Sequence, residues 1–248
     1  MEIWDDGIRL DAALDIPEAG ETRHPLVIVL HGFTGNKEER HILAMSDMMN
    51  SLGFATLRPD LYGHGRSGGS FQDHTLYKWL GNVLALVRYA EGLNAFSELY
   101  LCGHSQGGLT AMLAGAMLKD KVRGIIALSP AASIPENARK GEILGVHFDP
   151  DRIPDVLSGW DLALSGDYVR VAQTIHVEDA IRRFDKHVLI VHGEEDETIP
   201  VEVAVRAAKE YSVARLVVIP GETHCYDHHL DLAVDAVRTW LAAEKTLL

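Results

Sequence analysis

Cysteine, basic residues and long apolar runs are scarce in this chain of 248 residues, and each scarcity excludes a class of protein. The two cysteines, Cys102 and Cys225, do not stand in the CxxC or CxxH spacing of a zinc site. Lysines and arginines number 23 against 36 acidic residues, and the net charge of −13 argues against nucleic acid or an anionic membrane as a partner. No apolar run reaches the roughly 18 residues of a transmembrane helix.

A secretory signal peptide is not apparent in the first ten residues, MEIWDDGIRL, which have neither a basic nor an apolar stretch. The sequence therefore predicts a soluble, cytoplasmic protein. Its hydrophobic content of 47% is enough for a large core, and chains of this length often fold as one α/β unit. The oligomeric state stays open, with a homodimer as one possibility.

Short apolar runs alternate with amphipathic stretches along most of the chain. Because such alternation implies right-handed crossovers, we predict an α/β fold with a mostly parallel sheet flanked by helices. An N-terminal hairpin is expected at 2–15, with its turn at Asp6-Gly7. Strands covered on both faces are predicted at 25–32, 54–60, 98–103, 124–130, 187–193 and 214–221. Helices are expected near 37–51, 74–91, 106–118, 200–210 and 228–244.

The alternation is interrupted once, between residues 132 and 186. This stretch has no comparable apolar run, and it is too long for a plain connection. We therefore predict an α/β core formed by residues 1–131 and 187–248, and an inserted cap, residues 132–186, that folds over the active site at one end of the sheet.

The strongest chemical signal is GHSQG at 103–107, a G-x-S-x-G motif directly between a predicted strand and a predicted helix. A sharp turn there would hold Ser105 outside the sheet end, at a helix N-terminus that favours negative charge. Gly103 and Gly107 would remove side chains that such a turn brings into collision. We predict that Ser105 is a nucleophile, and the alternative is a plain turn of small residues.

A serine nucleophile needs a base, which in this fold order comes last, after the acid. Seven histidines follow Ser105, and His224 lies in a loop directly after the last apolar strand, where active sites of open α/β sheets gather. We predict that His224 is the base, and the alternative is a solvated loop histidine. His224 and His228 have the spacing of two metal ligands, but no further ligand accompanies them, so no metal is predicted.

Four carboxylates crowd the turn HGEEDETIP at 192–200, after another predicted strand. One of them should hold the imidazole of His224 in a single tautomer and stabilise its charged form. A short aspartate on a tight turn suits a fixed inward carboxylate better than a flexible glutamate, so we predict that Asp196 is this acid. Glu194, Glu195 and Glu197 are predicted to face water.

Acyl transfer also needs hydrogen-bond donors for the developing oxyanion. The backbone N–H groups of Gln106, directly after the nucleophile, and Phe33, in LHGFTG at 30–35, are the expected donors. A glycine-rich stretch, GHGRSG at 63–68, matches the dinucleotide pattern G-x-G-x-x-G. It lacks the helix and the acid that a nucleotide site requires, so we predict an active-site loop there.

The chain resembles the α/β-hydrolase superfamily along nearly its whole length, in LHGFTG, RPDLYGHGRSGG, CGHSQGG, HGEEDETIP and GETHCY. More narrowly, it resembles the small bacterial feruloyl (cinnamoyl) esterases in HGFTGNKEE, DLYGHGRSGG and the insertion that contains GDYVRVAQ. This resemblance implies a serine carboxylesterase that cleaves hydroxycinnamoyl esters through a Ser-His-Asp triad and an acyl-enzyme, without a cofactor. The implied partner is a small aromatic ester.

The resemblance also implies that polar cap residues bind the aromatic hydroxyl of the acyl group. It assigns this role to Tyr168, in GDYVRVAQ, for which packing within the cap is the alternative. Asn137, in IPENARKG, stands where relatives have a carboxylate, and this departure could weaken or retune recognition of the phenolic hydroxyl. Other functions stay open: a carbon–carbon bond hydrolase or thioesterase on the same scaffold, or a non-catalytic ligand receptor.

Overall fold

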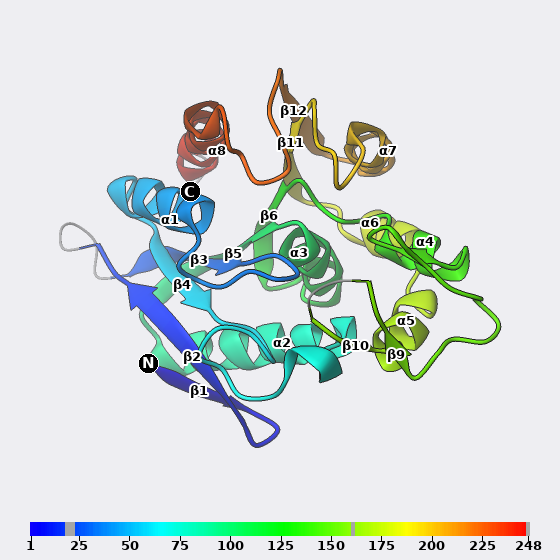
Figure 1. Ribbon diagram of the computed structural model, residues 1–248. Helices are drawn as coiled ribbons and strands as arrows, with labels where there is room; N and C mark the ends of the chain where they lie inside the picture. Colours follow the sequence, from blue (N-terminus) through cyan, green and yellow to red (C-terminus); the bar gives the residue numbers. More distant parts are fainter. Residues whose placement is uncertain (18–22, 160–161, 247–248) are drawn as a thin grey trace.

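The computed structural model describes residues 1–17, 23–159 and 162–246, and its centre is an eight-stranded sheet (Figure 1). The strand order is β1-β2-β4-β3-β5-β6-β11-β12. Strands β1 and β2 pair antiparallel, as do β2 and β4, and every pairing from β4 to β12 is parallel. The predicted mostly parallel sheet is therefore confirmed. The strand bounds are β1 (Glu2–Asp5), β2 (Ile8–Asp15), β3 (His24–Leu30), β4 (Ala55–Pro59), β5 (Phe96–His104), β6 (Val122–Leu128), β11 (His187–Gly193) and β12 (Ala214–Ile219).

Helices cover both faces of the sheet, which explains why its central strands are apolar without interruption. In β3, Leu26 and Ile28 belong to the core shared with α2 and α3, whereas Val27 and Val29 belong to the core shared with α1 and α8. Successive side chains of a strand point to opposite faces, so both sets must be apolar. The helix bounds are α1 (Arg40–Ser51), the 3-10 helix η1 (Phe71–Asp73), α2 (Leu76–Leu93), α3 (Gln106–Met117), α7 (Val201–Glu210) and α8 (Leu230–Lys245).

The N-terminal hairpin turns at the predicted dipeptide. Asp6 and Gly7 have φ angles of 46° and 76°, so both central positions of the turn are left-handed. This is the conformation that a two-residue hairpin loop requires, and aspartate and glycine are the residues that adopt it at low cost. The turn extends the antiparallel edge of the sheet beyond β4.

The stretch predicted as an inserted cap lies between β6 and β11. Helix α4 packs against α5, whereas α6 packs against α3 and α7. Helix α6 therefore belongs to the layer of helices that flanks the sheet (Figure 1). The segment that lies outside this layer runs from α4 to α5. The division at 131/132 and 186/187 stays a prediction. The bounds here are α4 (Ile134–Arg139), β7 (Glu142–Ile143), β8 (Val146–His147), β9 (Val156–Leu157), β10 (Leu164–Ser165), α5 (Gly166–Gln173) and α6 (Val177–Arg183).

No helix within the described ranges combines the length and the apolar character needed to cross a membrane.

Candidate active site

Ser105 lies at the turn between β5 and α3, in a backbone conformation that residues other than glycine rarely adopt. Its φ is 53° and its ψ is −119°, and its N–H donates to the carbonyl of Leu128 at 2.8 Å. The two glycines of the motif make this turn feasible. A Cβ on Gly103 would collide with the carbonyl of Gly107, and a Cβ on Gly107 would collide with the carbonyl of His31. Helix α3 can therefore start directly beside β5, with Ser105 at the carboxyl edge of the sheet.

Ser105, His224 and Asp196 form one continuous chain of hydrogen-bond contacts. Nε2 of His224 lies 2.9 Å from Oγ of Ser105, and Nδ1 lies 2.7 Å from Oδ2 of Asp196. The three residues follow the carboxyl ends of β5, β12 and β11, and parallel strands bring these ends to one edge. This geometry allows His224 to take the serine proton while its other nitrogen donates to the carboxylate.

Asp196 is fixed by four donors. Its Oδ1 accepts the backbone N–H groups of Thr198 at 3.0 Å and Ile199 at 2.7 Å, and its Oδ2 lies near His224 and also 3.1 Å from Nε2 of His192. Burial alone would raise the pKa of this carboxyl. The hydrogen bonds from His192, His224 and the Ile199 N–H outweigh burial and hold the pKa well below its usual range. Asp196 is therefore a buried anion beside the imidazole.

The three glutamates of the same turn lie at the surface. Glu194, Glu195 and Glu197 are exposed, whereas Asp196 is buried. Both backbone N–H groups that bind Oδ1 of Asp196 come from the next three residues, so the turn itself directs the aspartate inward. Of the four carboxylates, Asp196 is the one that contacts His224.

Three buried histidines lie beside the triad, and none of them has a role that was predicted from the sequence. Nε2 of His104 lies 2.9 Å from the carbonyl oxygen of His224, and the ring of His41 packs on His104 with 4.3 Å between centroids. Burial lowers the pKa of both, to about 4 for His41, so both are neutral near pH 7. The third is His192. Its position near the end of β11, four residues before Asp196, is the one feature of the sequence that could have indicated a place beside the triad.

The loop after β3 passes directly beside the nucleophile. A Cβ on Gly32 would lie only 3.3 Å from the Cβ of Ser105. Phe33 is the next residue, and Gln106, fully buried, opens α3 on the other side of Ser105. The backbone of both predicted oxyanion donors therefore adjoins the nucleophile, as an oxyanion hole requires.

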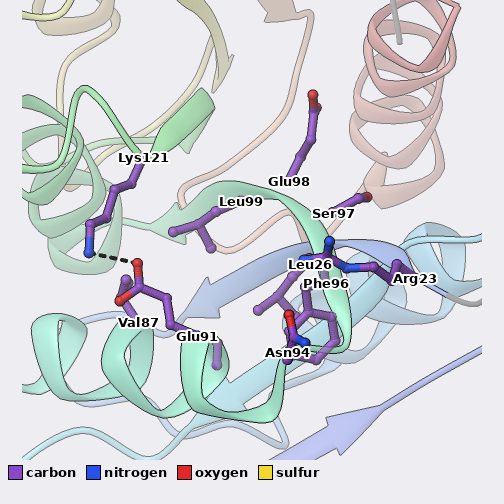
Figure 2. A pocket seen from close by; sticks show the side chains of 11 residues that line it. Arg23, Leu26, Val87, Glu91, Asn94, Phe96, Ser97, Glu98, Leu99 and Lys121 are labelled. Carbon is purple, nitrogen blue, oxygen red and sulfur yellow. Dashed lines mark hydrogen bonds and ion pairs between the residues drawn. The ribbon is translucent and has the colours of Figure 1, made fainter.

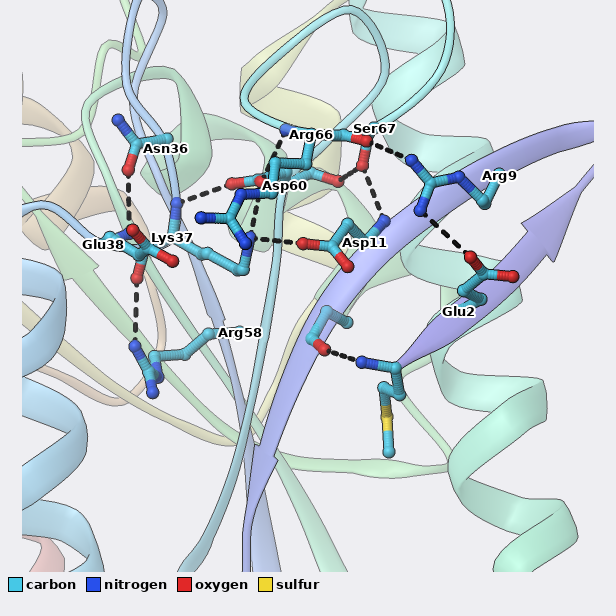
Figure 3. Close-up of polar contacts among 12 residues, drawn as sticks. Glu2, Arg9, Asp11, Asn36, Lys37, Glu38, Arg58, Asp60, Arg66 and Ser67 are labelled. Atoms are coloured by element: carbon cyan, nitrogen blue, oxygen red, sulfur yellow. Dashed lines mark hydrogen bonds and ion pairs between the residues drawn. The ribbon is translucent and has the colours of Figure 1, made fainter.

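An ion-pair network fixes the loop after β3 at Lys37, on the side away from Ser105 (Figure 3). The carboxylate of Asp60, which is 1% exposed, accepts the backbone N–H of Lys37 at 2.8 Å and its Nζ at 2.6 Å. Asp60 also accepts the N–H of Arg66, in the glycine-rich loop 63–68, at 2.9 Å. Burial opposes the charge of Lys37, but its bonds to Asp11 and Asp60 prevail and raise its pKa. The glycine-rich loop and the loop after β3 are thus held by one buried carboxylate.

The two predicted cap residues face different parts of the site. Tyr168, on α5, is fully buried; its hydroxyl donates to Oε1 of Gln106 at 2.6 Å, and its ring meets Phe33 edge to face. Asn137, on α4, lines a cavity of about 420 Å³ between the cap and the acid turn, together with Glu197 and Thr198. Tyr168 therefore adjoins the oxyanion region, whereas Asn137 adjoins the turn that carries Asp196.

Another cavity, of about 300 Å³, lies at the opposite end of the sheet (Figure 2). Lys121 and Glu91 pair at 2.6 Å on its wall, and Phe96 lies at the start of β5. A rise of about 3.3 Å per residue along β5 puts Phe96 roughly 25 to 30 Å from Ser105. This cavity is therefore separate from the triad. Its lining residues are Arg23, Leu26, Val87, Ala90, Glu91, Asn94, Phe96, Ser97, Glu98, Leu99 and Lys121.

Comparisons with solved structures show a near-complete match. Est1E from Butyrivibrio proteoclasticus, in a structure with ferulic acid bound, is 54% identical, with a TM-score of 0.98 over 99% of both chains. Alpha/beta hydrolase domain-containing protein 10 from mouse shares the fold, with a TM-score of 0.81 over 98% of both chains at 16% identity.

Curated proteins match at lower identity. Human protein ABHD12B is 24% identical over 77% of this chain and 50% of its own length, so the chain spans about half of this relative. The family model described as serine aminopeptidase, S33, matches residues 21–157, and the model described as TAP-like protein matches residues 162–246. With more than half of its residues in the first match and a triad geometry at the carboxyl edge of the sheet, this chain belongs to the serine aminopeptidase S33 family of α/β hydrolases.

Proposed function

We propose that this protein is a serine carboxylesterase that cleaves hydroxycinnamoyl esters of the feruloyl type. The observation that carries the proposal is the hydrogen-bonded chain from Ser105 through His224 to Asp196, beside a loop that offers backbone donors. The substrate class is supported by the 54% identity to Est1E, whose structure holds ferulic acid. The proposed partner is accordingly a small-molecule aromatic ester. The cytoplasmic location and the homodimer stay predictions.

In the first half of the reaction, Oγ of Ser105 attacks the ester carbonyl carbon while Nε2 of His224 takes the hydroxyl proton. The N–H groups of Phe33 and Gln106 stabilise the oxyanion that forms. When the tetrahedral intermediate collapses, the bond to the alcohol breaks, and the alcohol leaves with the proton from His224. The hydroxycinnamoyl group remains as an ester on Ser105.

In the second half, a water molecule attacks the acyl-enzyme and gives a proton to His224. Collapse of the second intermediate returns this proton to Ser105 and releases the hydroxycinnamic acid. The imidazole becomes positively charged twice in each cycle, and Asp196 stabilises that charge without taking the proton. The depressed pKa of Asp196 keeps it ionised throughout.

We propose that Tyr168 and Asn137 hold the acyl group from the cap side. The O–H of Tyr168 donates a hydrogen bond to Gln106, and its oxygen keeps lone pairs that can accept a phenolic O–H. Asn137 can both donate and accept, whereas a carboxylate at its position would only accept. The amide is therefore suited to a methoxy oxygen as well as to a hydroxyl.

A panel of esters tests the proposal with the purified protein. Methyl ferulate and methyl p-coumarate should be cleaved with the highest kcat/KM, and methyl cinnamate with a lower kcat/KM. The value for p-nitrophenyl butyrate, once corrected for its better leaving group, should be the lowest. A hydroxycinnamoyl thioester belongs in the panel, because its preference by tenfold or more would favour a thioesterase. If methyl ferulate binds and no ester is turned over, the chain is a receptor and the proposal fails.

A further inference from the structure

The carboxylate of Asp196 contacts two imidazoles, and the proposed mechanism uses only one of them. His192, near the end of β11, places its Nε2 3.1 Å from Oδ2 of Asp196 and 2.8 Å from the carbonyl oxygen of Ile199. The side chains of His192 and Asp196 are both fully buried. Because both neighbours of this nitrogen are acceptors, Nε2 must carry a proton, which it shares between them.

The other ring nitrogen determines the charge of His192. Nδ1 is buried and has no hydrogen-bond partner among the described residues. A proton on Nδ1 would place an N–H without a protein partner, and a positive charge, on a fully buried side chain. The geometry therefore favours a neutral His192 in the Nε2–H tautomer, whose N–H lies between the Ile199 carbonyl at 2.8 Å and Oδ2 of Asp196 at 3.1 Å and leaves the carboxylate charged.

We propose that His192 is a positioning residue for the triad, an inference that rests on the proposed function of Ser105, His224 and Asp196. Oδ1 of Asp196 is held by the Thr198 and Ile199 N–H groups, and His192 provides the matching anchor at Oδ2. The carboxylate plane is thus fixed from both ends, so Oδ2 stays aligned with Nδ1 of His224.

His192 also controls how basic His224 becomes. A hydrogen bond to Oδ2 withdraws part of the negative charge that Asp196 presents to the imidazole. Without the N–H of His192 beside Oδ2, the carboxylate stabilises the imidazolium more strongly, and a smaller fraction of the enzyme has a free base to take the serine proton. Among the described residues, His104 and His41 also lie close to His224, and both are neutral near pH 7 because burial lowers their pKa.

Two substitutions at His192 separate positioning from simple packing. His192→Leu keeps an apolar volume and removes the donor, and we expect kcat on p-nitrophenyl acetate to fall roughly tenfold to a hundredfold, with KM changed by less than about threefold. The acid limb of the kcat/KM profile should move to higher pH. His192→Gln can keep an N–H near the position of Nε2 and should recover most of kcat and the original acid limb.

A control on the same strand is His187, whose Nδ1 lies 2.6 Å from Glu244 at the amino end of β11. His187→Leu removes a histidine of β11 far from the triad and should leave kcat and the acid limb unchanged. If His192→Leu matches the wild type in kcat and in its acid limb, His192 is only a packing residue and the proposal is overturned.

A second measurement does not depend on turnover. In long-range ¹H–¹⁵N NMR spectra of the wild type, His192 should show the Nε2–H tautomer across the accessible pH range. The Nδ1–H resonance of His224, which reports its contact with Asp196, should shift in His192→Leu and stay in place in His187→Leu. An Nδ1–H tautomer of His192, or an unchanged Nδ1–H resonance of His224 in His192→Leu, contradicts the inference even if the protein proves to be an esterase. Conversely, the expected spectra without any ester turnover would uphold the contact and refute the proposed function.

Discussion

The hydroxyl of Tyr168, on α5, donates a 2.6 Å hydrogen bond to the side chain of Gln106, the residue directly after Ser105. Both side chains are fully buried, and Nε2 of Gln106 has no hydrogen-bond partner among the described residues. One hydrogen bond therefore joins α5 of the cap to the first turn of α3. A change at Tyr168 should therefore be felt at Gln106, whose backbone N–H is a proposed oxyanion donor.

Tyr168→Phe tests this link and the role of the hydroxyl toward substrate. Loss of the hydroxyl leaves Oε1 of Gln106 buried without its donor, so the free energy of unfolding in urea should fall by about 1 to 3 kcal/mol. If the tyrosine oxygen also accepts the phenolic O–H, kcat/KM for methyl ferulate should fall roughly fivefold to a hundredfold. Methyl cinnamate, which has no phenolic hydroxyl, should lose less.

Tyr77→Phe is the matched control, because it removes a 2.7 Å hydrogen bond to Thr174 at the exposed side of the cap. Its kinetics on both esters should stay within about twofold of the wild type, since exposed hydrogen bonds exchange readily with water. Equal losses on methyl ferulate and methyl cinnamate in Tyr168→Phe would mean that the hydroxyl serves Gln106 and not the substrate.

Ser105→Ala should abolish most turnover while the protein still folds. The residual rate in such variants comes from the oxyanion donors and substrate binding alone, so kcat should fall by about 10⁴-fold or more. Circular dichroism should be unchanged, because one hydroxyl is lost from a turn whose shape depends on its glycines. By intact-mass analysis, a serine-directed phosphonate should label the wild type once and the variant not at all. A labelled variant would identify a different nucleophile.

Asp196→Asn should be far more damaging than the corresponding change at any glutamate of the turn. The amide removes the charge and can donate to Nδ1 of His224, which imposes the wrong tautomer, so kcat should fall by about 10² to 10⁴-fold. Glu194→Gln, Glu195→Gln and Glu197→Gln should each stay within about threefold. These side chains are exposed, and charges there are screened over about 10 Å at 0.1 M salt. A collapse in a glutamate variant would reassign the acid.

The stability of the fold should fall as the pH drops below neutral, because several histidines are buried in the neutral form. Burial lowers the pKa of His31 and His74 to about 3 and that of His41 to about 4. The unfolded chain takes up protons at these positions near pH 6.5, and the folded chain does not. Stability is therefore lost from about pH 6.5 downward, by about 2 kcal/mol for each such histidine at pH 5.

Urea unfolding at pH 7.5 and pH 5.0 measures this loss. His41→Gln should reduce the difference between the two free energies by about 2 kcal/mol, since glutamine takes up no proton in either state. The carboxyl of Asp196 acts in a lower window: its folded pKa is depressed, so its contribution is lost only below about pH 4. An unchanged difference in His41→Gln would show that this histidine is protonated in the folded protein.

The parts of the site that could be predicted depend on local chemistry. The G-x-S-x-G turn can be predicted from the sequence because it needs two glycines. These glycines contact the backbone of their own motif and of the neighbouring strand end, where no Cβ fits. The hairpin turn at Asp6-Gly7 can be predicted because aspartate and glycine adopt at low cost the left-handed conformation that both positions have. The apolar strands place the predicted triad residues at three strand ends, and a parallel sheet brings such ends to one edge. The amino-acid sequence by itself therefore determines the fold class and the three strand ends at which the predicted triad residues lie.

Contacts between distant elements were decided by the tertiary structure. Whether Tyr168 meets solvent, substrate or Gln106 depends on how α5 packs against α3, since these residues lie 62 positions apart. His192 looked like an ordinary strand end, because its donation to Asp196 depends on a turn that folds the chain back within four residues. The neutral state of the buried histidines likewise follows from their burial in the folded protein. Such burial and distances arise from packing among many segments, and no local pattern of residues encodes them.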